Sequence, residues 1–160
     1  MSMEVFLRDS AETDTLAKAL ARSLPARAVI HLHGELGAGK STLARALLRE
    51  LGVTGPIKSP TYTLVERYPL GESEAVHLDL YRIAGAGELD FLGLDELAAA
   101  ARLWLVEWPE RGGSALPAAD LDIYLSVLGE GRQALLLANP HTASDWLPRL
   151  NEMAVLQPSS

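Results

Sequence analysis

One short segment limits the choice of folds more than any other part of this chain of 160 residues. Residues 34–41, GELGAGKS, match the pattern G-x-x-x-x-G-K-[ST] at every fixed position. An apolar run, AVIHLH at residues 28–33, precedes the segment, and a helical pattern follows it over residues 42–51. The order strand, glycine-rich loop, helix predicts a P-loop, in which backbone N–H groups at a helix N-terminus converge on phosphate oxygens.

The fixed residues of this loop predict what it binds. Lys40 is placed to bridge the β- and γ-phosphates of a nucleoside triphosphate, and the Ser41 hydroxyl is placed to ligate magnesium. The glycines occur in the order G-x-x-G-x-G, which differs from the dinucleotide fingerprint. The loop therefore predicts a nucleoside triphosphate together with a magnesium ion.

Short apolar runs alternate with helical patterns along the rest of the chain. Strands are expected near residues 4–8, 28–33, 63–68, 75–79, 103–106, 120–128 and 132–137, and helices near 11–24, 42–51, 88–92, 95–101 and 143–153. This order predicts an α/β fold: a P-loop NTPase-like single domain over residues 1–155, with a mixed, mostly parallel sheet, antiparallel edge strands and flanking helices. Residues 156–160 are expected to form a flexible C-terminal tail.

Composition excludes several classes of function. Lys and Arg number 14 against 21 Asp and Glu, so the formal net charge is −7, whereas proteins that grip a nucleic-acid backbone alone are normally basic. Cysteine is absent, which excludes disulfides, thiolate metal sites and a cysteine nucleophile. The start of the chain does not resemble a signal peptide, and no apolar run approaches the roughly 20 residues of a membrane span. We therefore expect a cytoplasmic protein.

The loop alone does not choose among the classes of P-loop protein. Guanine-specific members carry an N-K-x-D element, but neither Asn139 nor Asn151 precedes a lysine, which disfavours a GTPase. The arginines are scattered rather than gathered in a lid, which disfavours a small-molecule kinase without excluding it. A nucleotide-gated binding module with negligible hydrolysis is a further alternative.

Two acidic residues at predicted strand ends are candidates for the second magnesium-site group. Glu107 follows an apolar run at residues 103–106, and Asp79 follows another at residues 75–78. Either carboxylate also suits the commoner role of capping a loop. His31 and His33 are expected in the core or on a sheet face, because the spacing of the four histidines predicts no metal site.

Four motifs together resemble the ATPase family of bacterial tRNA threonylcarbamoyladenosine biosynthesis, the TsaE family (formerly YjeE). They are GELGAGKST at residues 34–42, SPTYTLVE at 59–66, HLDLYR at 77–82 and VEWPE at 106–110. Their order and spacing fit the family from about residue 4 to residue 137. Four linked motifs are far more specific than any one of them.

The resemblance implies roles for individual residues. It implies that the loop binds ATP through Leu36, Gly37, Ala38, Gly39, Lys40 and Ser41. It also implies that Ser41 and Glu107 ligate magnesium and that Lys40, Thr42, Asp79 and Glu107 serve turnover. Thr42, Ser10, Thr13 and Arg132 are implied to reach the nucleotide, and residues 59–63 to form a switch-like segment.

The resemblance further implies an accessory role. Members of the family act with a transferase pair, the TsaB and TsaD proteins, and their ATP hydrolysis is thought to reset that complex between turnovers. The expected activity is a weak, partner-stimulated, magnesium-dependent ATPase that meets tRNA only through the complex. The negative charge of this chain fits such a partner-binding ATPase better than an autonomous tRNA binder.

Overall fold

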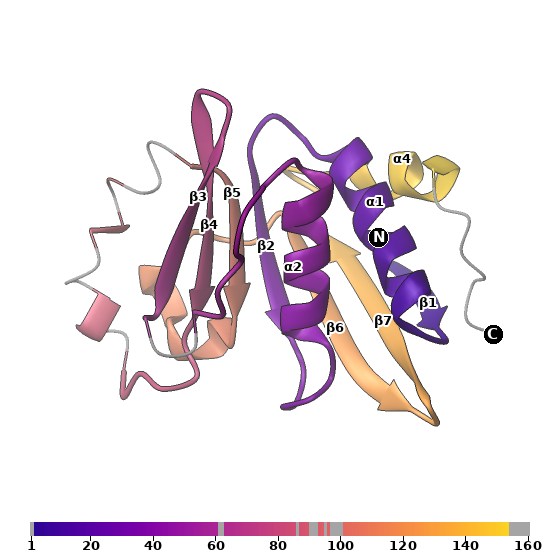
Figure 1. The fold of residues 1–160 in the computed structure, drawn as a ribbon, viewed down its shortest axis with the longest axis horizontal. Helices are drawn as coiled ribbons and strands as arrows, with labels where there is room; N and C mark the ends of the chain where they lie inside the picture. Colours follow the sequence, from indigo (N-terminus) through magenta and orange to yellow (C-terminus); the bar gives the residue numbers. More distant parts are fainter. Residues whose placement is uncertain are drawn as a thin grey trace.

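The computed structural model describes residues 2–60, 63–85, 87–89, 93–94, 96 and 101–153. Within them a seven-stranded sheet has the order β1-β7-β6-β2-β5-β4-β3 (Figure 1). The strands are β1 (Ser2–Leu7), β2 (Ala28–His33), β3 (Val65–Leu70), β4 (Ser73–Asp79), β5 (Ala101–Glu107), β6 (Leu121–Leu128) and β7 (Gly131–Ala138). The helices are α1 (Ser10–Ser23), α2 (Lys40–Glu50) and α4 (Trp146–Met153), with 3₁₀ turns η2 (Pro109–Arg111) and η3 (Gly113–Ala115).

The centre of the sheet is parallel and its two edges are antiparallel. β6, β2, β5 and β4 pair in parallel, whereas β7 and β1 continue one edge and β3 the other in antiparallel pairing. This arrangement confirms the predicted α/β class with its mixed sheet. It also brings the carboxyl ends of β2, β4 and β5 to one edge of the molecule, where ligands bind in parallel α/β sheets.

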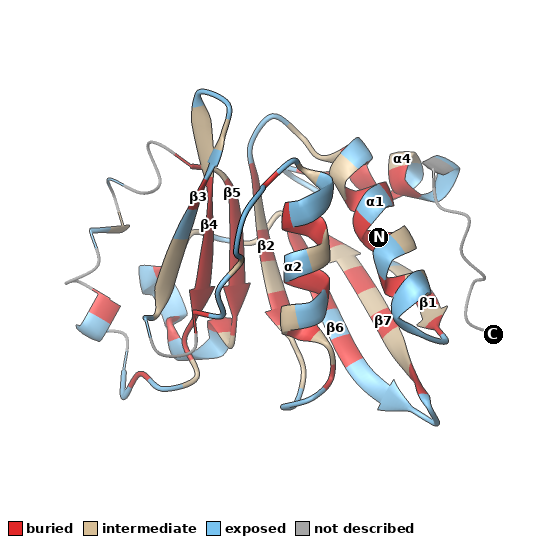
Figure 2. Cartoon of the chain, viewed as in Figure 1, coloured by how far each residue is buried: buried red, intermediate tan, exposed pale blue. Residues whose placement is uncertain are grey.

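Helices α1, α2 and α4 cover one face of the sheet, and described residues that follow β4 and β5, such as Leu80 and Leu116, pack against part of the other. The first core unites alternate residues of β2, such as Ile30 and Leu32, with Leu16 and Leu20 of α1 and Leu47 of α2. A second core joins Val76, Trp104 and Leu116 on the opposite face. β4 and β5 are almost wholly buried between these layers, whereas the β6–β7 turn is exposed (Figure 2).

Local chemistry explains where α1 and α4 lie. The Asp9 side chain caps α1 by accepting a 3.1 Å hydrogen bond from the Glu12 N–H. Trp146 of α4 is fully buried and donates its indole N–H to the Ser23 hydroxyl at 2.9 Å. This buried bond fixes the C-terminal helix against the end of α1.

Several element boundaries differ from those predicted. β3 begins at Val65 rather than residue 63, because Leu64 adopts a φ of 68° that no strand accommodates. α2 begins at Lys40 rather than residue 42, and α4 begins at Trp146 rather than residue 143. Ala101 starts β5, which corrects the predicted helix over 95–101 at its last residue.

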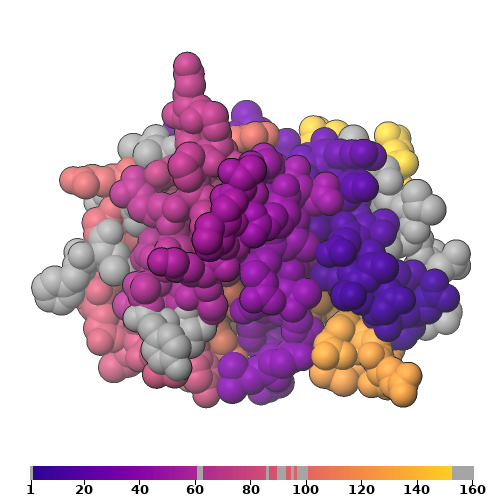
Figure 3. Space-filling view, viewed as in Figure 1, coloured from indigo at the N-terminus to yellow at the C-terminus, as the bar shows by residue number. Residues whose placement is uncertain are grey.

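Parts of the predicted chain lie outside the described residues. They are Thr61 and Tyr62, most of the helical stretches at 88–92 and 95–101, and the tail at 156–160. Across the described part of the chain, no helix combines the length and apolar character needed to cross a bilayer. The β3–β4 turn projects from the body of the molecule, as Figure 3 shows.

Candidate functional site

The glycine-rich segment that is predicted to form a P-loop lies between the end of β2 and the start of α2, as the sequence predicts. Gly39 precedes α2 with a φ of 104°, a conformation that glycine adopts without a Cβ penalty. Gly34 leaves β2 with a φ of 147°, and a Cβ there would collide with the carbonyl oxygen of Leu125. Both glycines are therefore required by the path of the loop.

Lys40 is held under an aromatic ring at the start of α2. Its side chain is buried, with 5% exposure, and its Nζ donates to the Gly34 carbonyl and, at 3.4 Å, to the Glu35 carbonyl. The same Nζ lies 4.0 Å from the ring centroid of Trp108, a cation–π distance. Burial lowers the pKa of Lys40, and the nearby carboxylates of Glu107 and Asp79 oppose that shift.

The two candidate carboxylates lie side by side at the ends of neighbouring strands. Asp79 of β4 and Glu107 of β5 are partners in the parallel register, and they are 6% and 2% exposed. Asp79 accepts a hydrogen bond of 3.0 Å from the Tyr81 N–H. The sequence places each carboxylate at a strand end, and the sheet brings them together.

Glu107 links the loop to the sheet. It accepts the Ser41 hydroxyl at 3.0 and 3.2 Å on its two oxygens, and it bonds His77 Nε2 at 2.7 Å. A hydroxyl and a carboxylate are hard oxygen donors of the kind that Mg²⁺ binds. The Ser41–Glu107 pair therefore fits the predicted magnesium ligands in chemistry and in proximity.

Two cavities meet along the P-loop. The larger, about 500 Å³, is lined by Leu36, Gly37, Gly39, Lys40, Ser41, Thr42, Asp79, Tyr81, Arg82, Glu107, Trp108 and Arg132. The smaller, about 250 Å³, is bounded by the start of α1 and the β6–β7 hairpin. Gly39, Thr42 and Arg132 line both cavities, so the two spaces adjoin.

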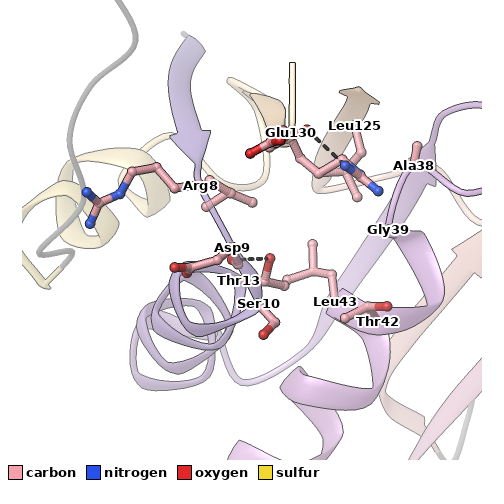
Figure 4. Close-up of a pocket in the computed structure, with 13 residues that line it drawn as sticks. Arg8, Asp9, Ser10, Thr13, Ala38, Gly39, Thr42, Leu43, Leu125 and Glu130 are labelled. Carbon is pink, nitrogen blue, oxygen red and sulfur yellow. Dashed lines mark hydrogen bonds between the residues drawn. The ribbon is translucent and has the colours of Figure 1, made fainter. Parts of the chain in front are cut away.

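The smaller cavity is built by three separate segments (Figure 4). Ser10 and Thr13 come from the first turns of α1, Ala38 and Thr42 from the loop and α2, and Leu125 from β6. Arg132 of β7 closes the group by donating to the Gly37 carbonyl at 3.2 Å. Asp9, the α1 cap, lies at the rim beside Thr13.

Every residue that the sequence assigned to the nucleotide or metal lines one of these two cavities. The described residues of the switch-like segment do not line either cavity. Ser59 and Thr63 are exposed, and Thr63 instead donates to the Glu66 carboxylate at 3.0 Å. The role of that segment stays a prediction.

His77 begins the motif at 77–82, but the sequence assigned it no role in the site. His77 is 1% exposed, and its Nδ1 has no hydrogen-bond partner within the described part of the protein. The contact between its Nε2 and Glu107 therefore holds the ring in place. The available signal was alternation: His77 and Asp79 are two residues apart on one strand and so face the same side. Trp108, which the sequence gives only as part of the motif at 106–110, lies over Lys40 and against Tyr81, and the Tyr81 and Trp108 ring centroids are 4.9 Å apart.

Comparisons with known proteins identify the family. A family model described as "Threonylcarbamoyl adenosine biosynthesis protein TsaE" matches residues 7–134. The TsaE proteins of Haemophilus influenzae and Synechocystis are 41% and 44% identical to this chain over 110 and 114 residues. These matches cover 69% of this chain in both cases, and 70% and 72% of the two relatives.

A solved structure agrees with the sequence relatives. The crystal structure of YdiB from Bacillus subtilis superposes with a TM-score of 0.74 and 26% identity, covering 96% of this chain and 94% of its own. The TsaE protein of Bacillus subtilis is 34% identical over 124 residues. By sequence and by fold, this chain belongs to the TsaE family of tRNA threonylcarbamoyladenosine biosynthesis proteins.

Proposed function

We propose that this TsaE-family protein binds ATP with magnesium and hydrolyses its terminal phosphoanhydride bond. The observation that carries the proposal is the convergence of Lys40, the Ser41–Glu107 pair and Asp79 on one cavity at the strand ends. Buried charges of both signs beside an N-terminal helix turn suit a triphosphate and its metal. Burial also keeps these groups in fixed positions before the ligand arrives.

Each residue has a distinct proposed task. Lys40 and the loop N–H groups contact the phosphates and stabilise the charge that develops on them. Ser41 and Glu107 hold the magnesium ion, which when bound neutralises charge on the phosphate oxygens. Asp79, held by the Tyr81 N–H, accepts a hydrogen bond from water in the cavity, and Thr42 lies where the two cavities meet.

The smaller cavity is the proposed place of the adenosine. Ser10 and Thr13 supply hydroxyl groups there, and Leu43 and Leu125 supply apolar surface. Arg132 spans both cavities, so its guanidinium lies between the proposed positions of base and phosphates. A pocket with an apolar wall and a few polar groups is typical of sites for the organic part of a ligand.

We further propose that hydrolysis serves the TsaB and TsaD proteins in the cytoplasm. The family places this chain in tRNA threonylcarbamoyladenosine biosynthesis. Its net charge of −7 disfavours independent tRNA binding, so the contact with tRNA is proposed to be indirect. The output of the ATPase is then a change in the transferase complex rather than a released product of its own.

The test is ATP hydrolysis by the purified protein, measured alone and after addition of TsaB and TsaD. Weak activity that rises with the pair is the expected result, and Lys40→Met should abolish both levels. ATP that stays bound and unhydrolysed with all partners present would instead favour a nucleotide-gated binding module. An ATP-dependent phosphorylated small molecule would favour a kinase.

A further inference from the structure

A second group of chemistry-bearing side chains lies on the sheet face opposite α2. His31 and His33 alternate with Ile30 and Leu32 along β2. The two aliphatic residues, Ile30 and Leu32, belong to the core under the helices. Successive strand residues point to opposite faces, so both imidazoles lie on the far face. In the parallel β2–β6 register, Asp122 is the partner of His31.

The three side chains converge. One ligand atom from each of His31, His33 and Asp122 lies within 4.8 Å of the others. His33 Nε2 is 2.7 Å from Asp122 Oδ1, and His31 Nδ1 is 3.9 Å from the same oxygen. Two imidazole nitrogens and one carboxylate oxygen are therefore grouped around a common point.

The outer contacts orient the rings for a ligand role. His31 Nε2 lies 3.1 Å from the Pro117 carbonyl, which only accepts, so this nitrogen carries the proton and Nδ1 presents its lone pair to the cluster. His33 Nδ1 faces Glu110 Oε2 at 3.8 Å. Metal-binding histidines characteristically direct their second ring nitrogen to a backbone carbonyl or a carboxylate in this way.

We propose that His31, His33 and Asp122 form a binding site for a zinc ion. Imidazole nitrogens favour zinc and related transition metals over magnesium, and two histidines with one carboxylate leave a fourth position for water. The side chains are 14%, 20% and 32% exposed, so an ion has access from solvent. This site is separate from the Ser41–Glu107 pair, which offers only oxygen donors.

Metal binding requires one proton to move. In the metal-free protein the 2.7 Å contact is a hydrogen bond from His33 Nε2 to Asp122. The ion replaces that proton between the nitrogen and the oxygen. In a neutral His33 the proton moves to Nδ1, which faces Glu110, whereas a doubly protonated ring releases it to solvent, and either way a neutral imidazole remains.

The site would tie three segments together. His31 and His33 belong to β2, Asp122 to β6, and Glu110 to η2, which follows Glu107 and Trp108. His33 also directly precedes Gly34, the first residue of the P-loop. A bound ion therefore restrains the chain immediately before the phosphate-binding loop.

The experiment is a calorimetric zinc titration of the full chain, made without a histidine tag and stripped with a chelator. Excess Mg²⁺ in the buffer occupies the oxygen-donor site, so the zinc signal reports the imidazole cluster. One equivalent is expected to bind, and affinity should fall at least tenfold in Asp122→Asn. His141→Gln, which removes an exposed histidine outside the cluster, should bind like the parent chain.

Two further readouts separate zinc binding from misfolding. Zinc should raise the Tm of the parent chain and of His141→Gln but not that of Asp122→Asn. Co²⁺ should give an intense visible spectrum in the parent chain that is lost in His31→Asn, a variant whose fold circular dichroism would check. Equal zinc affinity in the parent chain and Asp122→Asn, or no saturable binding by the parent chain, would overturn the proposal.

Discussion

The two cavities along the P-loop are built on different principles. The larger rests on the ends of parallel strands and is lined by the buried carboxylate of Glu107, which accepts a hydrogen bond from the Ser41 hydroxyl and contacts the buried His77. The smaller lies between the start of α1 and an antiparallel hairpin, and most of its polar residues, such as Ser10 and Glu130, are exposed. Buried charges demand partners, whereas exposed polar groups exchange freely with water.

This difference in burial predicts how strongly each cavity responds to substitution. In the larger cavity, removal of one group leaves a buried charge without its partner, so single substitutions should have large effects. In the smaller cavity, water replaces a lost side chain at little cost, so effects should be small. Substitutions at Lys40, His77 and Arg132 test this ranking.

The largest effect is expected at Lys40. Lys40→Met removes the cation in the larger cavity and should weaken ATP binding at least about 100-fold, which corresponds to about 2.7 kcal/mol. Calorimetric titration with ATP measures the loss. Lys18→Met, at an exposed position of α1, is the matched control and should bind ATP normally.

The same variant should be more stable than the parent chain without nucleotide. Burial lowers the pKa of Lys40, so the unfolded chain binds more protons and the charged lysine opposes folding below its folded pKa. At neutral pH, Lys40→Met should therefore have a higher unfolding free energy than the parent chain. This difference should shrink as the pH rises toward the ordinary pKa of lysine, because the lysine then loses its charge. Urea unfolding of both chains across that pH range measures it. A difference that does not change with pH would show that burial does not disfavour the charged form of Lys40.

An intermediate effect is expected at His77, which acts through Glu107. His77→Leu removes the 2.7 Å contact and should lower magnesium-dependent ATP affinity about tenfold. His77→Gln, which keeps a donor, should recover part of it. ATP affinity measured without magnesium should not change, and an equal loss with and without the ion would assign His77 a purely structural role.

The smallest effect is expected at Arg132. Arg132→Ala removes the hydrogen bond to the Gly37 carbonyl and should weaken ATP binding about fivefold, or about 1 kcal/mol. Arg67→Ala, on β3 and paired with Glu74, is the control. A loss at Arg132 as large as that at Lys40 would contradict the ranking.

The sequence predicted the features that depend on neighbouring residues. The P-loop, its strand and its helix were predictable because the pattern, the apolar run and the helical spacing are all local. Glu107 and Asp79 were both identifiable because each ends an apolar strand. Their position side by side was not, because it depends on the β4–β5 register.

Contacts between distant segments escaped prediction for the same reason. Ser41 and Glu107 are 66 residues apart, and His33 and Asp122 are 89 apart. The histidine spacing alone predicted no metal site because the carboxylate comes from β6, which lies beside β2 only in the folded sheet. The predicted start of β3 was wrong because Leu64 has a positive φ, and a leucine, unlike a glycine, does not indicate such a conformation in the sequence.

The most direct test of the account is the magnesium dependence of ATP binding in the parent chain and in Glu107→Gln. The substitution preserves shape but removes the charge that faces Ser41. The account predicts that magnesium strengthens ATP binding by the parent chain and has little effect on the variant. An unchanged magnesium effect in Glu107→Gln would contradict it and move the metal role to Asp79.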